Sequence, residues 1–167
     1  MSRIKIFGES ADYFNTTEGI LFTNNEAEIK LFGRKIGEDY LSRCAEYFVQ
    51  LPSELRKTLC EATAQYLNDL LDEHADEYDA DRLPELSAFN VIAFLRPLEL
   101  HTEAHDLLSE EDAPPAFSLK LEFKPVPVEC VEWVVRGDNA IYVGEYRGLS
   151  PWNDKPTEKN WNYIRGD

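Results

Sequence analysis

The sequence predicts an α+β fold: a mainly antiparallel sheet of about six strands, with an αα-hairpin and a short third helix packed on one face. Two observations carry this prediction. Several short segments alternate apolar and polar residues with a period of two, and a long segment between them changes to helical spacing. We expect residues 1–149 to form a single α+β domain and residues 150–167 to form an irregular aromatic tail packed on it.

The chain is long enough to bury a core without disulfides or structural metals. It has 167 residues, of which 43% are hydrophobic, and a domain of about 150 residues buries roughly 70% of its unfolded surface. The cysteines Cys44, Cys60 and Cys130 are far apart and odd in number. This pattern favours reduced thiols over a disulfide framework.

The sheet is organised around a hairpin expected at residues 130–148. Apolar and polar residues alternate on both sides of a turn at residues 137–139, where Gly, Asp and Asn tolerate the backbone angles of a tight turn. In a regular register Trp133 lies on the same face as Tyr142 and Gly144. We therefore expect its indole to cover the glycine.

The remaining strands follow from the same alternation, and a polar stretch at residues 12–18 is expected to form a turn. The other expected strands are at residues 3–7, 19–23, 27–31, 97–102 and 117–123. A second hairpin, with its turn at residues 24–25, joins the strands at 19–23 and 27–31, and the latter strand ends near Gly33.

Helical spacing is expected in two long segments and one short one. Apolar residues recur every three or four positions from residue 38 to 51 and again from 53 to 73, and Pro52 separates the two stretches. This arrangement predicts an αα-hairpin. Residues 84–95 are expected to form the short third helix, with Leu86 and Phe89 on its apolar stripe, and a buried strand at 90–95 is the alternative.

The charge is strongly acidic and unevenly distributed. The chain has 32 acidic and 17 basic residues, a net charge of −15. Between Glu61 and Asp112 there are 15 acidic residues and two basic ones, so this segment carries nearly all of the excess. Such a field repels nucleic acid and anionic membranes and accelerates encounter with a basic protein. The simpler interpretation is a solvated surface that keeps the protein in solution.

The candidate partner-binding residues lie in two acidic segments, 69–81 and 103–112. They are Asp72, Asp76, Glu77, Asp79, Asp81, Glu110, Glu111 and Asp112. Acidic residues at the end of a helix oppose its dipole, so the first group is not there for helix stability.

The N-terminal sequence lacks the apolar core and the cleavage site of a signal peptide. No apolar run approaches the roughly 20 residues of a membrane span. We therefore expect a cytoplasmic protein without membrane contact.

Catalytic and metal-binding motifs are weak. His101 and His105 are four residues apart, but Thr102 stands where a zinc-protease motif requires Glu, and the local pattern is strand followed by loop. No phosphate loop, dinucleotide fingerprint or nucleophile elbow is present in the sequence. We therefore expect no cofactor, metal or catalytic residue, and His101 and His105 are only weak metal candidates.

Residues 132–152 have the sequence E-W-V-V-R-G-D-N-A-I-Y-V-G-E-Y-R-G-L-S-P-W. This end of the chain, with the segment L-F-G-R-K-I-G-E-D-Y-L at 31–41 and the helix around 59–62, resembles a group of uncharacterised bacterial domains of unknown function. Small acidic domains of this kind are often similar to accessory or immunity proteins. The resemblance implies no functional residue.

Three functions fit these observations. The first is a cytoplasmic interaction domain that binds a basic protein, as an immunity protein or antitoxin does. The second is a DNA-mimic inhibitor of a DNA-binding protein, and the third is a small hydrolase or metal-binding protein. The partner and the oligomeric state are left open.

Overall fold

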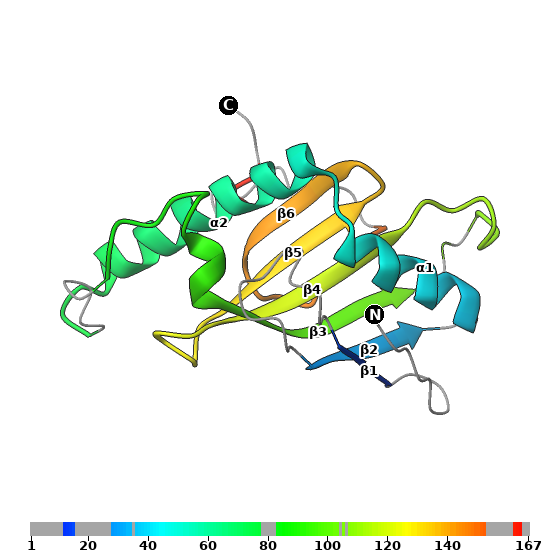
Figure 1. The fold of residues 1–167 in the computed structure, drawn as a ribbon, viewed down its shortest axis with the longest axis horizontal. Helices are drawn as coiled ribbons and strands as arrows, with labels where there is room; N and C mark the ends of the chain where they lie inside the picture. The colour runs from blue at the N-terminus through cyan, green and yellow to red at the C-terminus, as the bar shows by residue number, and fades with distance from the viewer. Residues whose placement is uncertain are drawn as a thin grey trace.

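Among the residues that the structure describes, six strands form one mixed sheet and lie side by side in their order along the chain (Figure 1). The computed structural model describes residues 12–15, 28–34, 36–77, 83–103, 105, 107–152 and 162–164. The strands are β1 (Asp12–Asn15), β2 (Glu28–Arg34), β3 (Leu95–Glu103), β4 (Ala116–Phe123), β5 (Cys130–Arg136) and β6 (Asn139–Glu145). The helices are α1 (Glu38–Val49), α2 (Ser53–Glu73) and the 3₁₀ helix η2 (Val91–Phe94).

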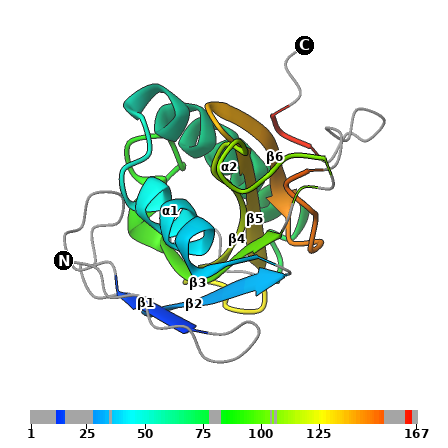
Figure 2. The ribbon, with the colours of Figure 1, turned by 90° about the vertical axis from the view of Figure 1, so that its right-hand side faces the viewer.

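Strand pairing is antiparallel except between β2 and β3, which are parallel. Parallel neighbours need a long connection that crosses over the sheet. Here α1 and α2 supply most of that connection, and both helices lie on the same face (Figure 2). The predicted α+β class and the two predicted long helices are therefore confirmed. The predicted αα-hairpin is wrong, because α2 continues along the long axis from the end of α1 and does not fold back on it (Figure 1).

The core lies between this helical layer and the sheet, and Trp133 of β5 is its largest fully buried side chain. The indole N–H of Trp133 donates a hydrogen bond of 2.8 Å to the hydroxyl oxygen of Thr63 in α2. The Thr63 hydroxyl in turn donates to the carbonyl of Leu59 at 2.6 Å. Towards α1, the rings of Phe48 and Phe117 pack edge to face with centroids 5.9 Å apart.

The expected third helix is wrong, and so is the alternative strand over most of 90–95. Only the four residues Val91–Phe94 are helical, and the backbone is extended from Leu95 onwards. The Asn90 side chain bonds to the backbone of Ser87 and Glu85, an arrangement that competes with a regular helix. Pro97 disfavours helical geometry at the residue before it.

The first strand was also not predicted. Asp12–Asn15 was expected to be part of a turn but pairs with β2. This segment contains Tyr13 and Phe14, whose aromatic side chains favour strands. The expected strands at 3–7 and 19–23 and the turn at 24–25 lie outside the described residues. The five other strands correspond to predicted ones.

A β-bulge makes the expected register of the last hairpin wrong. The turn has two residues, Gly137 and Asp138, with Gly137 at φ +58°. A shift between Val134 and Val135 then places Trp133 opposite Val143. A regular register would place Trp133 opposite Tyr142. The extra residue of a bulge reverses the face of every following side chain, so Trp133 faces α2 and does not cover Gly144.

The N–H of Tyr163 donates to the Val143 carbonyl at 2.9 Å, and the Asn162 side chain bonds to the backbone of Ile141 and Val143. These contacts pair the segment 162–164 with the outer edge of β6. Within the described part of the chain, no helix has the length and apolar character needed to cross a bilayer.

The Trp133→Ala substitution is expected to lower the free energy of unfolding by about 3–5 kcal/mol, because it leaves a large cavity under α2. Urea denaturation measures this loss. The control is Val128→Ala, at a side chain that is 83% exposed, where a change within about 0.5 kcal/mol is expected. A loss below about 1 kcal/mol for Trp133→Ala would contradict the central place of this side chain.

Candidate functional site at the acidic end of helix α2

The two acidic segments are not brought together. Asp72, Asp76 and Glu77 lie at the C-terminal end of α2, or just beyond it. The connection between β3 and β4, which carries Glu110–Asp112, lies at the opposite end of the long axis (Figure 1). Asp79 and Asp81 lie outside the described residues. Any single partner-binding surface therefore uses one segment or the other.

In the β3–β4 connection, two of the three candidate carboxylates have partners within the fold. Glu110 Oε1 accepts a hydrogen bond of 2.9 Å from the N–H of Gly37, at the start of α1. A carboxylate at this end of a helix is favourable because the helix dipole is positive there. Asp112 Oδ2 accepts from the Ser109 hydroxyl at 3.0 Å.

The side chain of Arg43 fixes the same loop to α1. Its Nη2 donates to the carbonyls of Glu110 and Ala113 at 3.0 and 2.7 Å. Together with the Glu110 cap, these bonds give the loop a structural role in holding the start of α1.

The carboxylates at the end of α2 are different. Asp72 and Asp76 are exposed, and their side chains form no hydrogen bond or ion pair with another described residue. Glu77 lies 3.6 Å from Nδ1 of His74, a contact that becomes an ion pair only when the histidine is protonated. The last turn of α2 contains no basic residue, so these charges oppose the helix dipole and remain in water.

Residues 83–90 run beside this part of α2 and are tied to it by Asn68. The Asn68 amide donates to the Leu86 carbonyl at 2.9 Å, and its oxygen accepts from the Leu86 N–H at 3.0 Å. Leu86 itself is buried. The loop therefore has a fixed position against the helix.

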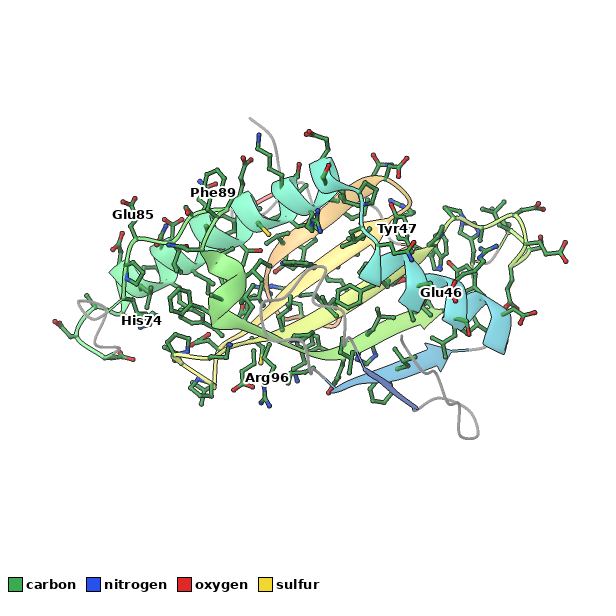
Figure 3. The ribbon with its side chains drawn as sticks, viewed as in Figure 1. Glu46, Tyr47, His74, Glu85, Phe89 and Arg96 are labelled. Carbon is green, nitrogen blue, oxygen red and sulfur yellow. The ribbon has the colours of Figure 1, made fainter. Side chains whose placement is uncertain are left out.

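Phe89 projects from this loop and is 98% exposed. Figure 3 shows it with Glu85 and His74 on the half of the molecule that holds the C-terminal part of α2. The apolar spacing of residues 84–95 predicts that Phe89 lies on the stripe of a helix. Because residues 87–90 form a tight turn instead, the ring points into solvent. No pattern in the sequence distinguishes this exposed phenylalanine from a buried one.

The two histidines considered for metal binding make separate contacts. His101 stacks on Phe32 with ring centroids 4.6 Å apart, and its Nε2 lies 2.8 Å from Glu99 Oε1. Nδ1 of His105 accepts hydrogen bonds from the backbone N–H groups of Leu107 and Leu108 at 2.9 and 3.0 Å. Within the described residues, no group of three or more His, Cys, Asp or Glu side chains is placed to hold a metal ion.

Sequence reasoning missed Glu132, which is fully buried on the sheet face away from the helices. Oε2 of Glu132 accepts from the Ser118 hydroxyl at 2.6 Å and from the N–H of Leu149 at 3.1 Å, and Oε1 accepts from the N–H of Arg147 at 3.2 Å. Gly144 lies opposite Glu132 and leaves room for the carboxylate.

The geometry makes Glu132 a structural anchor. Its hydrogen bonds hold residues 147–149 across the sheet, where Leu149 packs against Val134 and Tyr142. Burial raises the pKa of Glu132 above its ordinary value of 4.5, and the bonds from Ser118 and the backbone oppose this rise. A carboxylate without solvent exposure cannot meet a substrate from solution.

The model of one protein family, described as a domain of unknown function (DUF6985), matches residues 6–150. The chain belongs to this family. No curated protein and no solved structure matches the chain significantly. The resemblance to uncharacterised domains is thus confirmed, and the candidate site of this DUF6985 domain is defined by its own geometry.

The Glu132→Gln variant tests the buried carboxylate through the pH dependence of stability. Because the folded-state pKa is raised, the contribution of Glu132 to stability is greatest at low pH and is lost as the pH rises through that pKa. The free energy of unfolding of the wild type, relative to Glu132→Gln, should therefore fall as the pH increases from about 4. Urea denaturation at several pH values measures this difference. A difference that grows with pH would mean that the hydrogen bonds outweigh burial.

Proposed function

We propose that this chain is a protein-interaction domain that binds a basic protein through the acidic end of α2. We define this surface by its exposed carboxylates, Asp72, Glu73, Asp76, Glu77 and Glu85. The observation that carries the proposal is that they remain in solvent at a helix end where they are unfavourable. Two of the three candidate carboxylates of the other acidic segment, Glu110 and Asp112, are engaged within the fold.

The charge pattern suits association better than stability. Negative charges in the last turn of a helix each cost a few tenths of a kcal/mol, roughly 0.3–1 at low ionic strength. Asp79 and Asp81 follow in the sequence and add to its negative charge. A concentrated field of one sign increases the encounter rate with a partner of opposite sign. The expected partner is therefore basic.

An immunity or antitoxin role is a specific form of this function. A toxin that cleaves or modifies nucleic acid has a positively charged substrate surface, because it must contact phosphates. An acidic domain bound over that surface would block it. The charge of the α2 end and the resemblance to small acidic accessory domains support this interpretation.

The two alternative functions receive less support. A DNA mimic needs carboxylates along an extended row to replace phosphates, whereas the described candidates lie at two separate ends (Figure 1). Competition of the partner with duplex DNA would revive that proposal. A hydrolase or metal protein would need converging ligands or reactive groups, and the two histidines make other contacts.

The double variant Asp72→Lys/Asp76→Lys is expected to reduce the association rate constant by about tenfold at low salt and to weaken its dependence on salt. The partner is the protein retained from a host lysate by the immobilised wild-type chain, and stopped-flow mixing measures the rate. The matched control is Glu46→Lys/Glu111→Lys, which changes two exposed carboxylates elsewhere and the net charge by the same amount. Equal slowing by both variants would contradict a localised surface.

A further inference from the structure

We infer that Phe89 is the apolar anchor of the interface at the acidic end of α2, and that it inserts into an apolar pocket with a cationic rim on the basic partner. This inference rests on the proposed function. It names the residue whose contact slows dissociation of the complex. It also specifies the shape of the partner's binding site.

The ring of Phe89 lies in solvent. Phe89 is 98% exposed, so its ring contributes almost nothing to the core of this chain. The other large apolar side chains found exposed among the described residues are Leu107, Leu108 and Val128, and none of them is aromatic. Aromatic side chains supply large contact areas and are enriched in interfaces.

Hydrogen bonds hold the backbone around Phe89 in place. The N–H of Ser87 donates to Asn90 Oδ1 at 2.8 Å, the N–H of Phe89 donates to Ser87 Oγ at 3.2 Å, and the N–H of Val91 donates to the Ser87 carbonyl at 3.0 Å. Buried Val91 follows the turn, and Leu86 precedes it. A ring on a backbone that is already ordered loses little conformational entropy when it binds.

Phe89 lies on a loop that is held against α2. Asn68 holds Leu86 against α2 one helical turn before Asp72, and Phe89 follows Leu86 by three residues. Figure 3 shows Phe89 on the same half of the molecule as Glu85 and His74. Energetically dominant interface residues are apolar or aromatic groups within a more polar rim, and the exposed carboxylate of Glu85 lies four residues before Phe89 in the same loop.

The negative charge of this surface favours a basic protein over a second copy of this chain as the binding partner. A second copy of this chain would bring its own carboxylates against these, and like charges oppose such a contact. A basic protein with Lys or Arg around an apolar pocket complements both parts of the surface. Arg also stacks favourably on aromatic rings.

The exposed Leu107 and Leu108 form the strongest competing candidate. Their backbone is also held in place, by Nδ1 of His105. Two of the neighbouring carboxylates, on Glu110 and Asp112, are already engaged within the fold. The charges near Leu107 and Leu108 therefore do not indicate which kind of partner would cover them. Leu107 serves instead as a control position.

The test compares Phe89→Ser with Leu107→Ser, a substitution of a side chain that is 89% exposed at the opposite end. The probe is the basic protein retained by the wild-type chain from a host lysate, identified by mass spectrometry and purified. Surface plasmon resonance should show Phe89→Ser weakening the complex by about 30-fold or more, almost entirely through faster dissociation. Leu107→Ser should change the affinity by less than about twofold. Unchanged thermal unfolding checks that the variants are folded.

The outcomes separate the inference from the proposed function. If Phe89→Ser binds like the wild type while Asp72→Lys/Asp76→Lys associates slowly, the acidic surface stands and the anchor is wrong. If the wild type retains no protein, or none whose binding depends on the acidic end, the proposed function fails and the inference fails with it. If sedimentation shows a wild-type dimer that Phe89→Ser abolishes, the occupant is a second copy and the basic pocket is wrong.

Discussion

The burial of Trp133 against α2 is the contact on which the rest of the structure depends. Its hydrogen bond to Thr63 joins β5 to the middle of the long helix. This contact fixes where α2 lies, and α2 in turn positions Asn68, which holds the loop carrying Phe89. The proposed binding surface is thus positioned by the core, although every group that would contact a partner lies in solvent.

The bulge in the last hairpin determines how the two faces of the sheet are used. One extra residue directs Trp133 towards the helices and places Glu132 opposite Gly144 on the other face. The buried carboxylate then ties down residues 147–149, and Leu149 covers Val134 and Tyr142. The outer face of β5 and β6 is therefore closed by the chain itself, at the cost of burying an acidic group.

Much of the fold follows from sequence periodicity, because alternation and helical spacing are local properties. They predict five of the strands and both long helices. The parallel pairing of β2 and β3 depends on where α1 and α2 cross the sheet, and the bulge depends on a single residue, so neither is visible in the pattern. The third helix was wrong because local side-chain bonds at Ser87 and Asn90 outweighed apolar spacing.

The candidate site was only partly predictable, for a related reason. Charge density is visible in a sequence, and it located both acidic segments. Whether a carboxylate is engaged depends on distant partners: Glu110 accepts a hydrogen bond from Gly37, 73 positions away, while the Asp72 side chain forms no hydrogen bond or ion pair with another described residue. The exposure of Phe89 likewise follows from a turn stabilised by side chains, which periodicity does not report.

The central claim is that partners bind at the acidic end of α2 and not at the β3–β4 connection. Amide hydrogen exchange of the free chain and of its complex tests this claim most directly. Binding at the proposed surface predicts slower exchange in residues 68–77 and 83–91, with residues 107–113 unchanged. Protection confined to residues 107–113, or to the outer face of β5 and β6, would contradict it.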